Sequence, residues 1–157
     1  PATRGLLSAA LGPLLAEHPA AVLDHLVLPL LWADSGTAQA EALTRLAKEL
    51  PPPTLARLIE AMARGGDGAW SDAQAGLLKD ALARKPPLRG ETLGALLDRA
   101  EMHVEATKGS LKFGNAIFSL VRSYLPQLGE HAAVARRVAA SLSTFMGKNT
   151  LKLLDKA

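Results

Sequence analysis

The strongest constraint on the fold is a helical spacing of apolar residues, which recurs along almost the whole chain and is broken by proline and glycine. Apolar residues three and four positions apart lie on one face of an α-helix. The clearest such stripe is Phe113, Ile117, Leu120, Val121 and Tyr124. Leu and Ala, both strong helix formers, dominate the apolar residues, whereas the aromatic residues are only two Trp, one Tyr and three Phe. The sequence therefore predicts an all-α fold.

Five further stripes cover most of the remaining chain. They are Leu43, Leu46, Ala47 and Leu50; Leu55, Leu58, Ile59 and Met62; Leu77, Leu78, Ala81 and Leu82; Leu93, Leu96, Leu97, Ala100 and Val104; and Val134, Val138 and Leu142. Between the stripes lie "ELPPPT", "RGGDGAW", "RKPPLRGE", "TKGS" and "PQLGE", which contain the residues that end helices. Ser71 and Gln74 in "SDAQ" fit a capping box at a helix start. The pattern predicts about eight or nine helices joined by short links.

The order of these helices indicates a repeat architecture. Short links make consecutive helices antiparallel neighbours, and helix pairs recur roughly every 35–40 residues, at about 37–63, 71–106 and 110–142. This period favours antiparallel helical repeats, in the form of a HEAT-like α-solenoid. The sequence has no sharp internal repeat, so a compact irregular bundle is the alternative. We expect residues 1–157 to form a single domain, and the start at Pro1 indicates a C-terminal fragment of a longer chain.

The segment from Val22 to Trp32 is apolar on nearly all sides. We therefore expect it between neighbouring helices, with Pro29 kinking or splitting it. Its surroundings, "AAVLDHLVLPLLWA", are shorter than the roughly 20 apolar residues of a membrane helix and carry Asp24 and His25, so no membrane partner is expected. The chain has no Cys, which excludes disulfides and thiolate chemistry.

The positive charge is concentrated in the last third of the chain. Residues 1–105 carry 10 Lys and Arg against 13 Asp and Glu, whereas residues 106–157 carry 8 against 2. A basic region of this kind suits an acidic protein surface or a nucleic acid, although a solvated basic face without a partner is equally compatible with it. Direct DNA binding through Arg136, Arg137, Lys148, Lys152 and Lys156 is a weaker alternative, because stacking aromatic residues are scarce there.

Catalytic and cofactor signatures do not emerge from the sequence. In "EMHVE", Glu101 and Glu105 are one helical turn apart, but His103 points off the face that they share, so a metal site is not favoured. "GGDG" lacks the surrounding pattern of a phosphate-binding loop, and no nucleophile elbow is present. We expect a protein that is not an enzyme and that needs no cofactor or metal.

Several segments, in order, give the sequence a family resemblance. They are "VLPLL", "AQAEALTRLAKEL", "PTLARLIEAM", "WSDAQAGLLKDAL", "ETLGALLDRAEMHVEAT", "GSLKFGNAIFSLVRSYLPQL" and "STFMGKNTLKLL". From about Leu14 onward, the chain resembles the C-terminal domain of the Fanconi anaemia group E protein family. The last segment resembles the closing Thr-Phe-apolar-x-Lys signature of that family. Gly147 departs from the pattern, because a better helix former is expected there, and the leucines after Lys148 are shifted by one residue.

The resemblance implies a nuclear adaptor subunit without catalytic residues. The family's domain is a helical-repeat rod in the Fanconi anaemia core complex, a ubiquitin ligase assembly that acts in the repair of DNA interstrand crosslinks. The resemblance implies the group C and group F proteins as partners. It also implies that the group D-two protein is the substrate presented for monoubiquitination. A generic helical scaffold with unrelated partners is the alternative.

The closing segment is the candidate docking site. If a last helix begins near Thr144, steps of about 100° per residue spread its apolar side chains too widely for one stripe. Some of them must therefore face away from the core. Together with the resemblance, this favours a partner-binding site of Thr144, Phe145, Met146, Lys148 and Lys152, in which an exposed apolar residue has a basic rim. The alternative is that Phe145 closes the end of the core.

Overall fold

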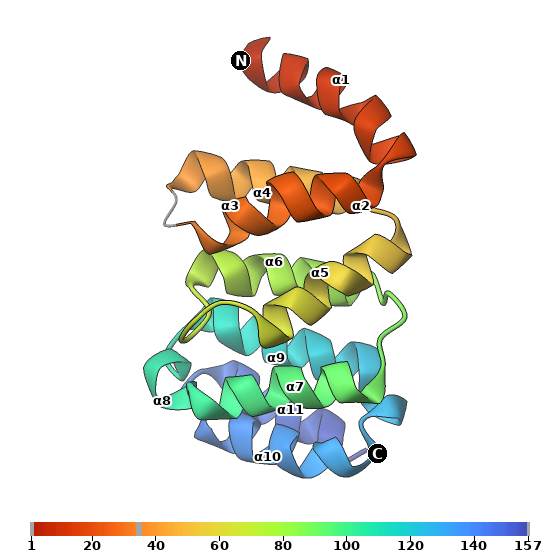
Figure 1. Ribbon diagram of the computed structural model, residues 1–157. Helices are drawn as coiled ribbons and strands as arrows, with labels where there is room; N and C mark the ends of the chain where they lie inside the picture. Colours follow the sequence, from red (N-terminus) through yellow and green to blue (C-terminus); the bar gives the residue numbers. More distant parts are fainter. Residues whose placement is uncertain (1, 34–35, 157) are drawn as a thin grey trace.

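The structure is a computed structural model that describes the backbone of residues 2–33 and 36–156, with side chains described from Ala9 onward within those ranges. Figure 1 shows a stack of helices, and no strand occurs among the described residues. The predicted all-α class is therefore confirmed.

The helices are α1 (Ala2–Glu17), α2 (Pro19–Val22), α3 (Leu28–Trp32), α4 (Thr37–Glu49), α5 (Pro52–Arg64), α6 (Asp72–Ala83), α7 (Gly90–Met102), α8 (Val104–Thr107), α9 (Leu111–Tyr124), α10 (Ala132–Ser141) and α11 (Phe145–Leu154). A π-helical turn covers Leu23–Val27, and short 3-10 turns cover Leu125–Gln127 and Gly129–His131. There are more segments than the eight or nine expected, because two of the predicted helices are divided. One division is at His103, between α7 and α8.

The other division lies in the apolar segment that contains Pro29. The π-helical turn precedes this proline, and the Leu28 N–H donates to the carbonyl of Leu23, five residues earlier. Proline has no N–H and clashes with the preceding helical turn, so a local widening of the helix accommodates it. The segment, which was expected to be kinked or split at Pro29, stays helical and contains a π-helical turn between α2 and α3.

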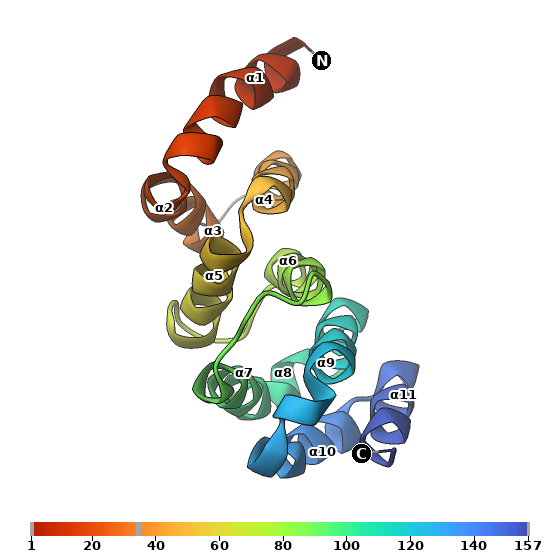
Figure 2. The same cartoon turned by 90° about the vertical axis from the view of Figure 1, so that its right-hand side faces the viewer.

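The helices form two layers, seen end-on in Figure 2. One layer contains α2–α3, α5, α7 and α10, and the other contains α4, α6, α9 and α11. Within a layer, α6 packs on α9, α9 on α11, α5 on α7, and α7 on α10, and α10 also packs closely on α11 across the layers. Helix α1 projects from one end of the stack (Figure 1).

The apolar stripes face the interior of this stack. Leu120 is 1% exposed, and the other members of its stripe are buried with it. Val104 and Val134 are only partly buried, because each lies at an end of its helix. The predicted capping box is present: the Gln74 N–H donates to Ser71 Oγ at 3.1 Å, and the Ser71 N–H donates to Gln74 Oε1 at 2.9 Å.

Arginine side chains connect helices by binding the carbonyl groups that a helix end leaves free. Arg84, directly after α6, donates to the Ala47 and Leu50 carbonyls at the end of α4, both at 2.8 Å. Arg136 of α10 donates to the carbonyl of Leu154 at the end of α11. A cation near a helix C-terminus also interacts favourably with the helix dipole. These hydrogen bonds join neighbouring helices in addition to their apolar packing.

None of the helices among the described residues is, alone, long and apolar enough to cross a membrane. The stretches Ala9–Glu17 and Pro19–Trp32 reach that length and composition only when taken together, and they are bent by 119° relative to one another.

Candidate functional site

The candidate site lies on α11, which closes the stack. Thr144 precedes the helix in an extended conformation, and α11 begins at Phe145, close to the start near Thr144 considered from the sequence. The helix packs closely on α9 and α10 because two glycines leave room for it. A Cβ atom at Gly147 would lie 2.6 Å from the Ala139 carbonyl oxygen, and one at Gly114 of α9 would lie 2.9 Å from Thr144 Oγ1. Gly147, which departs from the family pattern, is therefore required by the close approach of α10.

The two sides of α11 differ sharply in exposure. Phe145 is 63% exposed, and Lys148 and Lys152 are also exposed. On the opposite side, Thr150 is fully buried and Leu154 is 2% exposed. At about 100° per residue, the exposed residues share one outward face of the helix. The alternative in which Phe145 closes the end of the core is therefore wrong.

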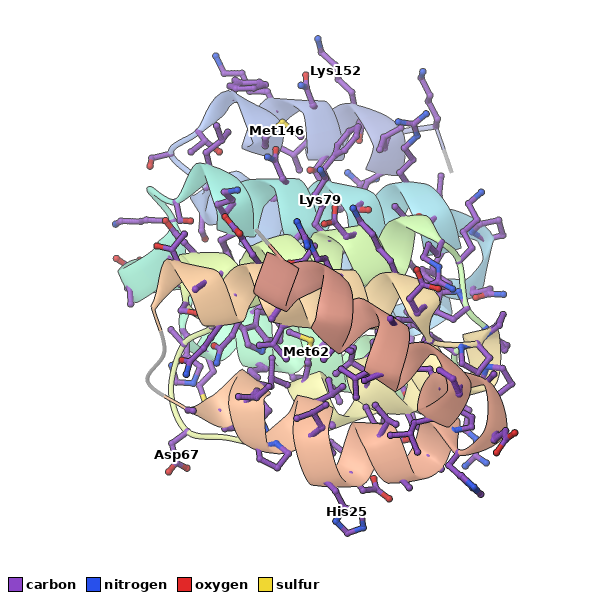
Figure 3. All side chains as sticks on the ribbon, turned by 90° about the horizontal axis from the view of Figure 1, so that it is seen from above. His25, Met62, Asp67, Lys79, Met146 and Lys152 are labelled. Carbon is purple, nitrogen blue, oxygen red and sulfur yellow. The ribbon has the colours of Figure 1, made fainter. Side chains whose placement is uncertain are left out.

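Met146 and Thr144 do not lie on this outward face. Met146 is 8% exposed and packs against Gly114, whereas Lys152 points away from the stack (Figure 3). Met146 is displaced by about 100° from Phe145, which turns it towards the core. Thr144 is half-buried, and its hydroxyl is buried without a hydrogen-bond partner. Of the five residues predicted as the site, the structure brings Phe145, Lys148 and Lys152 together at the surface.

The basic residues of the last third have different roles. Arg136 pairs with Asp155 at 2.7 Å. Arg137 binds Glu101 of α7 through two hydrogen bonds of 2.6 and 3.3 Å, which lower the pKa of the Glu101 carboxyl. Lys148 and Lys152 form no ion pair with any described residue. These two lysines are therefore available to an outside acidic group.

The neighbouring helix α9 has an outward stripe that was not predicted from the sequence. Leu111 is 48% exposed, and Asn115, Phe118 and Arg122 follow it at i+4, i+7 and i+11. This spacing places all four on one helix face. The helical spacing of these four residues is visible in the sequence. The buried stripe of the same helix is more apolar, so the periodicity is assigned to that stripe alone.

Two further observations concern the rest of the described structure. No group of three His, Cys, Asp or Glu residues is close enough to hold a metal ion in the part of the chain that the structure describes. A groove of about 850 Å³ lies at the opposite end of the stack, where Leu11, Leu15, Leu30 and Leu46 are among its lining residues. Its lining comes from α1, the segment around α3, and α4, and it is mostly apolar.

Comparisons with known proteins do not identify the chain. It matches no protein-family model, no curated protein and no solved structure.

Proposed function

We propose that the chain is a HEAT-like α-solenoid of antiparallel helical repeats that serves as a protein-binding scaffold. The two-layered stack supports this reading, because each layer is built by contacts between helices that are not consecutive in the chain. Repeats of this kind contact mainly their neighbours and present extended surfaces to partners. A helix at the end of the stack, such as α11, is then available for docking on its outward side.

The scaffold acts as a non-enzymatic adaptor of the Fanconi anaemia core ubiquitin ligase in the nucleus. It docks the group D-two protein for monoubiquitination during interstrand crosslink repair, beside the group C and group F proteins. The observation that carries this proposal is the exposed Phe145 with Lys148 and Lys152 around it. These residues lie in the segment whose Thr-Phe-apolar-x-Lys order resembles the family's closing signature. An aromatic residue with a polar rim is a frequent arrangement at protein interfaces.

Co-precipitation tests this function directly. The chain is expected to capture the group D-two protein, and Phe145→Ala is expected to reduce the capture strongly. The matched control is Met102→Ala, because Met102 is 77% exposed but lies on α7, away from α11. Lys148→Glu is compared with Lys48→Glu, which makes the same charge change on α4. Failure to capture both the group D-two and the group C proteins would overturn the proposed adaptor role.

A basic DNA-binding module is the second candidate, and the unpaired Lys148 and Lys152 favour it. Binding through phosphate contacts weakens steeply as salt increases. A labelled duplex should then bind at low salt, and Lys148→Glu and Lys152→Glu should each weaken the binding. Absence of duplex binding at low salt would remove this candidate.

A further inference from the structure

The outward faces of α9 and α11 form one continuous surface, which we call the α9–α11 surface. The two helices start together, because both the N–H and the hydroxyl of Ser143, just before α11, donate to the Lys108 carbonyl just before α9, at 3.0 Å. Gly114, in the first turn of α9, lies against Met146, in the first turn of α11. Both helices then run in the same direction within their layer (Figure 1).

The orientation of α11 turns Phe145 towards the α9 side of its outward face. Met146 contacts α9, whereas Gly147 lies against Ala139 and Leu142 at the end of α10. Each residue advances the helix by about 100°, so the residue before Met146 lies on the side away from α10. Phe145 is therefore placed at the same end and on the same side as Leu111, the first residue of α9.

Exposed and half-exposed apolar side chains lie along this surface. Phe145 is 63% exposed and Leu111 is 48% exposed. Phe118 is half-buried and lies two turns further along α9, on the same face as Leu111. Large apolar side chains that gather on one exposed face, with polar residues around them, are characteristic of interaction surfaces.

The charge on the two helices has a single sign. Neither α9 nor α11 contains Asp or Glu, whereas together they contain Lys112, Arg122, Lys148 and Lys152. The Lys112 side chain lies next to Gly76 of α6, in a groove that Asp72 also lines. The other three cations form no ion pair with a described residue, so they are left for an outside carboxylate.

We propose that the α9–α11 surface binds an acidic amphipathic helix of a partner protein. The apolar side of that helix contacts Leu111, Phe118 and Phe145, and carboxylates beside it pair with Arg122, Lys148 and Lys152. A helix that follows α11 for its length needs about 10–14 residues. This inference rests on the proposed docking role and specifies the chemistry of the docked segment. A nucleic acid would use the cations but would leave Leu111 without a complementary group.

A titration followed by the amide resonances of the chain tests the surface without assuming a partner. The probe is a helical peptide of about 14 residues with Leu on one side and Glu on the other. The control peptide has the same composition in an order that removes the apolar side. The first peptide is expected to shift resonances of α9 and α11 and to bind at least about tenfold more tightly than the control. Equal affinities, no binding, or preferential binding of a DNA duplex at this surface would overturn the inference.

Two leucine variants separate this surface from exposed apolar residues in general. Leu111 and Leu14 are both 48% exposed, but Leu14 lies on α1 at the other end of the stack. Leu111→Ser is expected to weaken peptide binding at least about fivefold, and Leu14→Ser to leave it unchanged, while both keep the melting temperature of the parent chain. Unchanged peptide binding by a folded Leu111→Ser chain would contradict the inference.

The outcome also distinguishes this inference from the adaptor role. If the peptide binds as expected but the group D-two protein is not captured, the surface stands and the proposed partner is wrong. If the group D-two protein is captured through Phe145 but is unaffected by Leu111→Ser and Arg122→Glu, the adaptor role stands and the two-helix surface is wrong.

Discussion

At the scale of single residues, the hydroxyl of Tyr124 links α9 to the segment between α6 and α7. The hydroxyl donates to the carbonyl of Pro86 at 2.6 Å, and the side chain is 3% exposed. Burial disfavours the charged phenolate and raises the pKa of Tyr124 to about 12. The folded state therefore holds the neutral phenol more strongly than the unfolded chain, in which a tyrosine has a pKa of about 10.

This difference predicts how stability depends on alkaline pH. Because the pKa of Tyr124 is raised by folding, its contribution is fully present below about pH 10 and is lost as the pH rises through about 12. Tyr124→Phe is expected to lower the free energy of unfolding at neutral pH by about 1 kcal/mol and to flatten the alkaline decrease. Tyr124 is the one tyrosine of the chain, so tyrosinate absorbance measures its ionisation directly. An ordinary pKa near 10 in the folded protein would contradict the account.

At the scale of elements, Arg99 connects α7 with α3 and with the loop after α5. Its guanidinium lies 5.6 Å from the ring centre of Trp32 and 5.4 Å from that of Trp70. It also donates to the carbonyls of Met62, Gly65 and Gly68. Burial lowers the pKa of Arg99, and the charge of Asp67 opposes that effect. A planar side chain with several donors satisfies these contacts together, which a lysine ammonium does not.

Arg99→Lys is therefore expected to destabilise the chain although it keeps the charge. The loss of these hydrogen bonds and of the cation–π contacts with both rings should lower the free energy of unfolding by roughly 1–3 kcal/mol. Trp32 and Trp70 are the two tryptophans of the chain, so fluorescence during denaturant unfolding reports on this cluster. Arg89→Lys, at an exposed position before α7, is the control and is expected to change little. Equal stability of the two variants would show that the Arg99 contacts contribute nothing.

A pair of glycine variants tests the close packing of α11. Alanine is normally better than glycine inside a helix by about 1 kcal/mol. Gly76→Ala on α6 is expected to stabilise, because its Cβ would meet Lys112 only at an ordinary 3.8 Å. Gly147→Ala is expected to destabilise by roughly 1–3 kcal/mol, because its Cβ would approach the Ala139 carbonyl. Thermal unfolding of both variants checks the sign, and stabilisation by Gly147→Ala would show that α11 is packed less closely.

The sequence predicts individual elements better than it predicts the contacts between them. Leu58 and Leu96 belong to predicted stripes and are buried, because periodicity alone determines which face of a helix is apolar. The capping box at Ser71 was predictable because both of its partners are local. The burial of Met146 beside the exposed Phe145 was not predictable, since both are apolar and only the position of α9 decides between them. The contacts of Arg99 join segments more than 30 residues apart, and no local pattern encodes them.

At the scale of the whole molecule, stability depends on the core between the two layers. Leu120→Ala removes a side chain that is 1% exposed in the centre of the most apolar stripe. Its loss should lower the free energy of unfolding by about 2–5 kcal/mol, which includes the lost burial and the cavity that remains. Leu111→Ala on the same helix, at a 48% exposed position, is expected to change it by less than about 1 kcal/mol. Calorimetric melting of both variants checks the prediction, and similar melting temperatures would mean that the faces of α9 are misassigned.

The concentration of positive charge is another property of the whole chain that the sequence predicts only in part. The count of Lys and Arg in residues 106–157 locates the basic region. It does not show that Arg136 and Arg137 are engaged with Asp155 and Glu101, because those pairs form between separate helices. On α9 and α11, Arg122, Lys148 and Lys152 form no ion pair with a described residue, and these three cations belong to the proposed α9–α11 surface.

We propose that the stack binds its partner through a surface whose main apolar residue is Phe145. The most direct test is a melting curve and a binding curve for the same Phe145→Ala chain, with the group D-two protein as the partner. Because Phe145 is 63% exposed, the account predicts an unchanged melting temperature. It also predicts binding weaker by roughly 2 kcal/mol or more, while Met102→Ala leaves both curves unchanged. A Phe145→Ala chain that melts normally and binds as tightly as the parent chain, or one that loses binding only because it unfolds, would contradict the account.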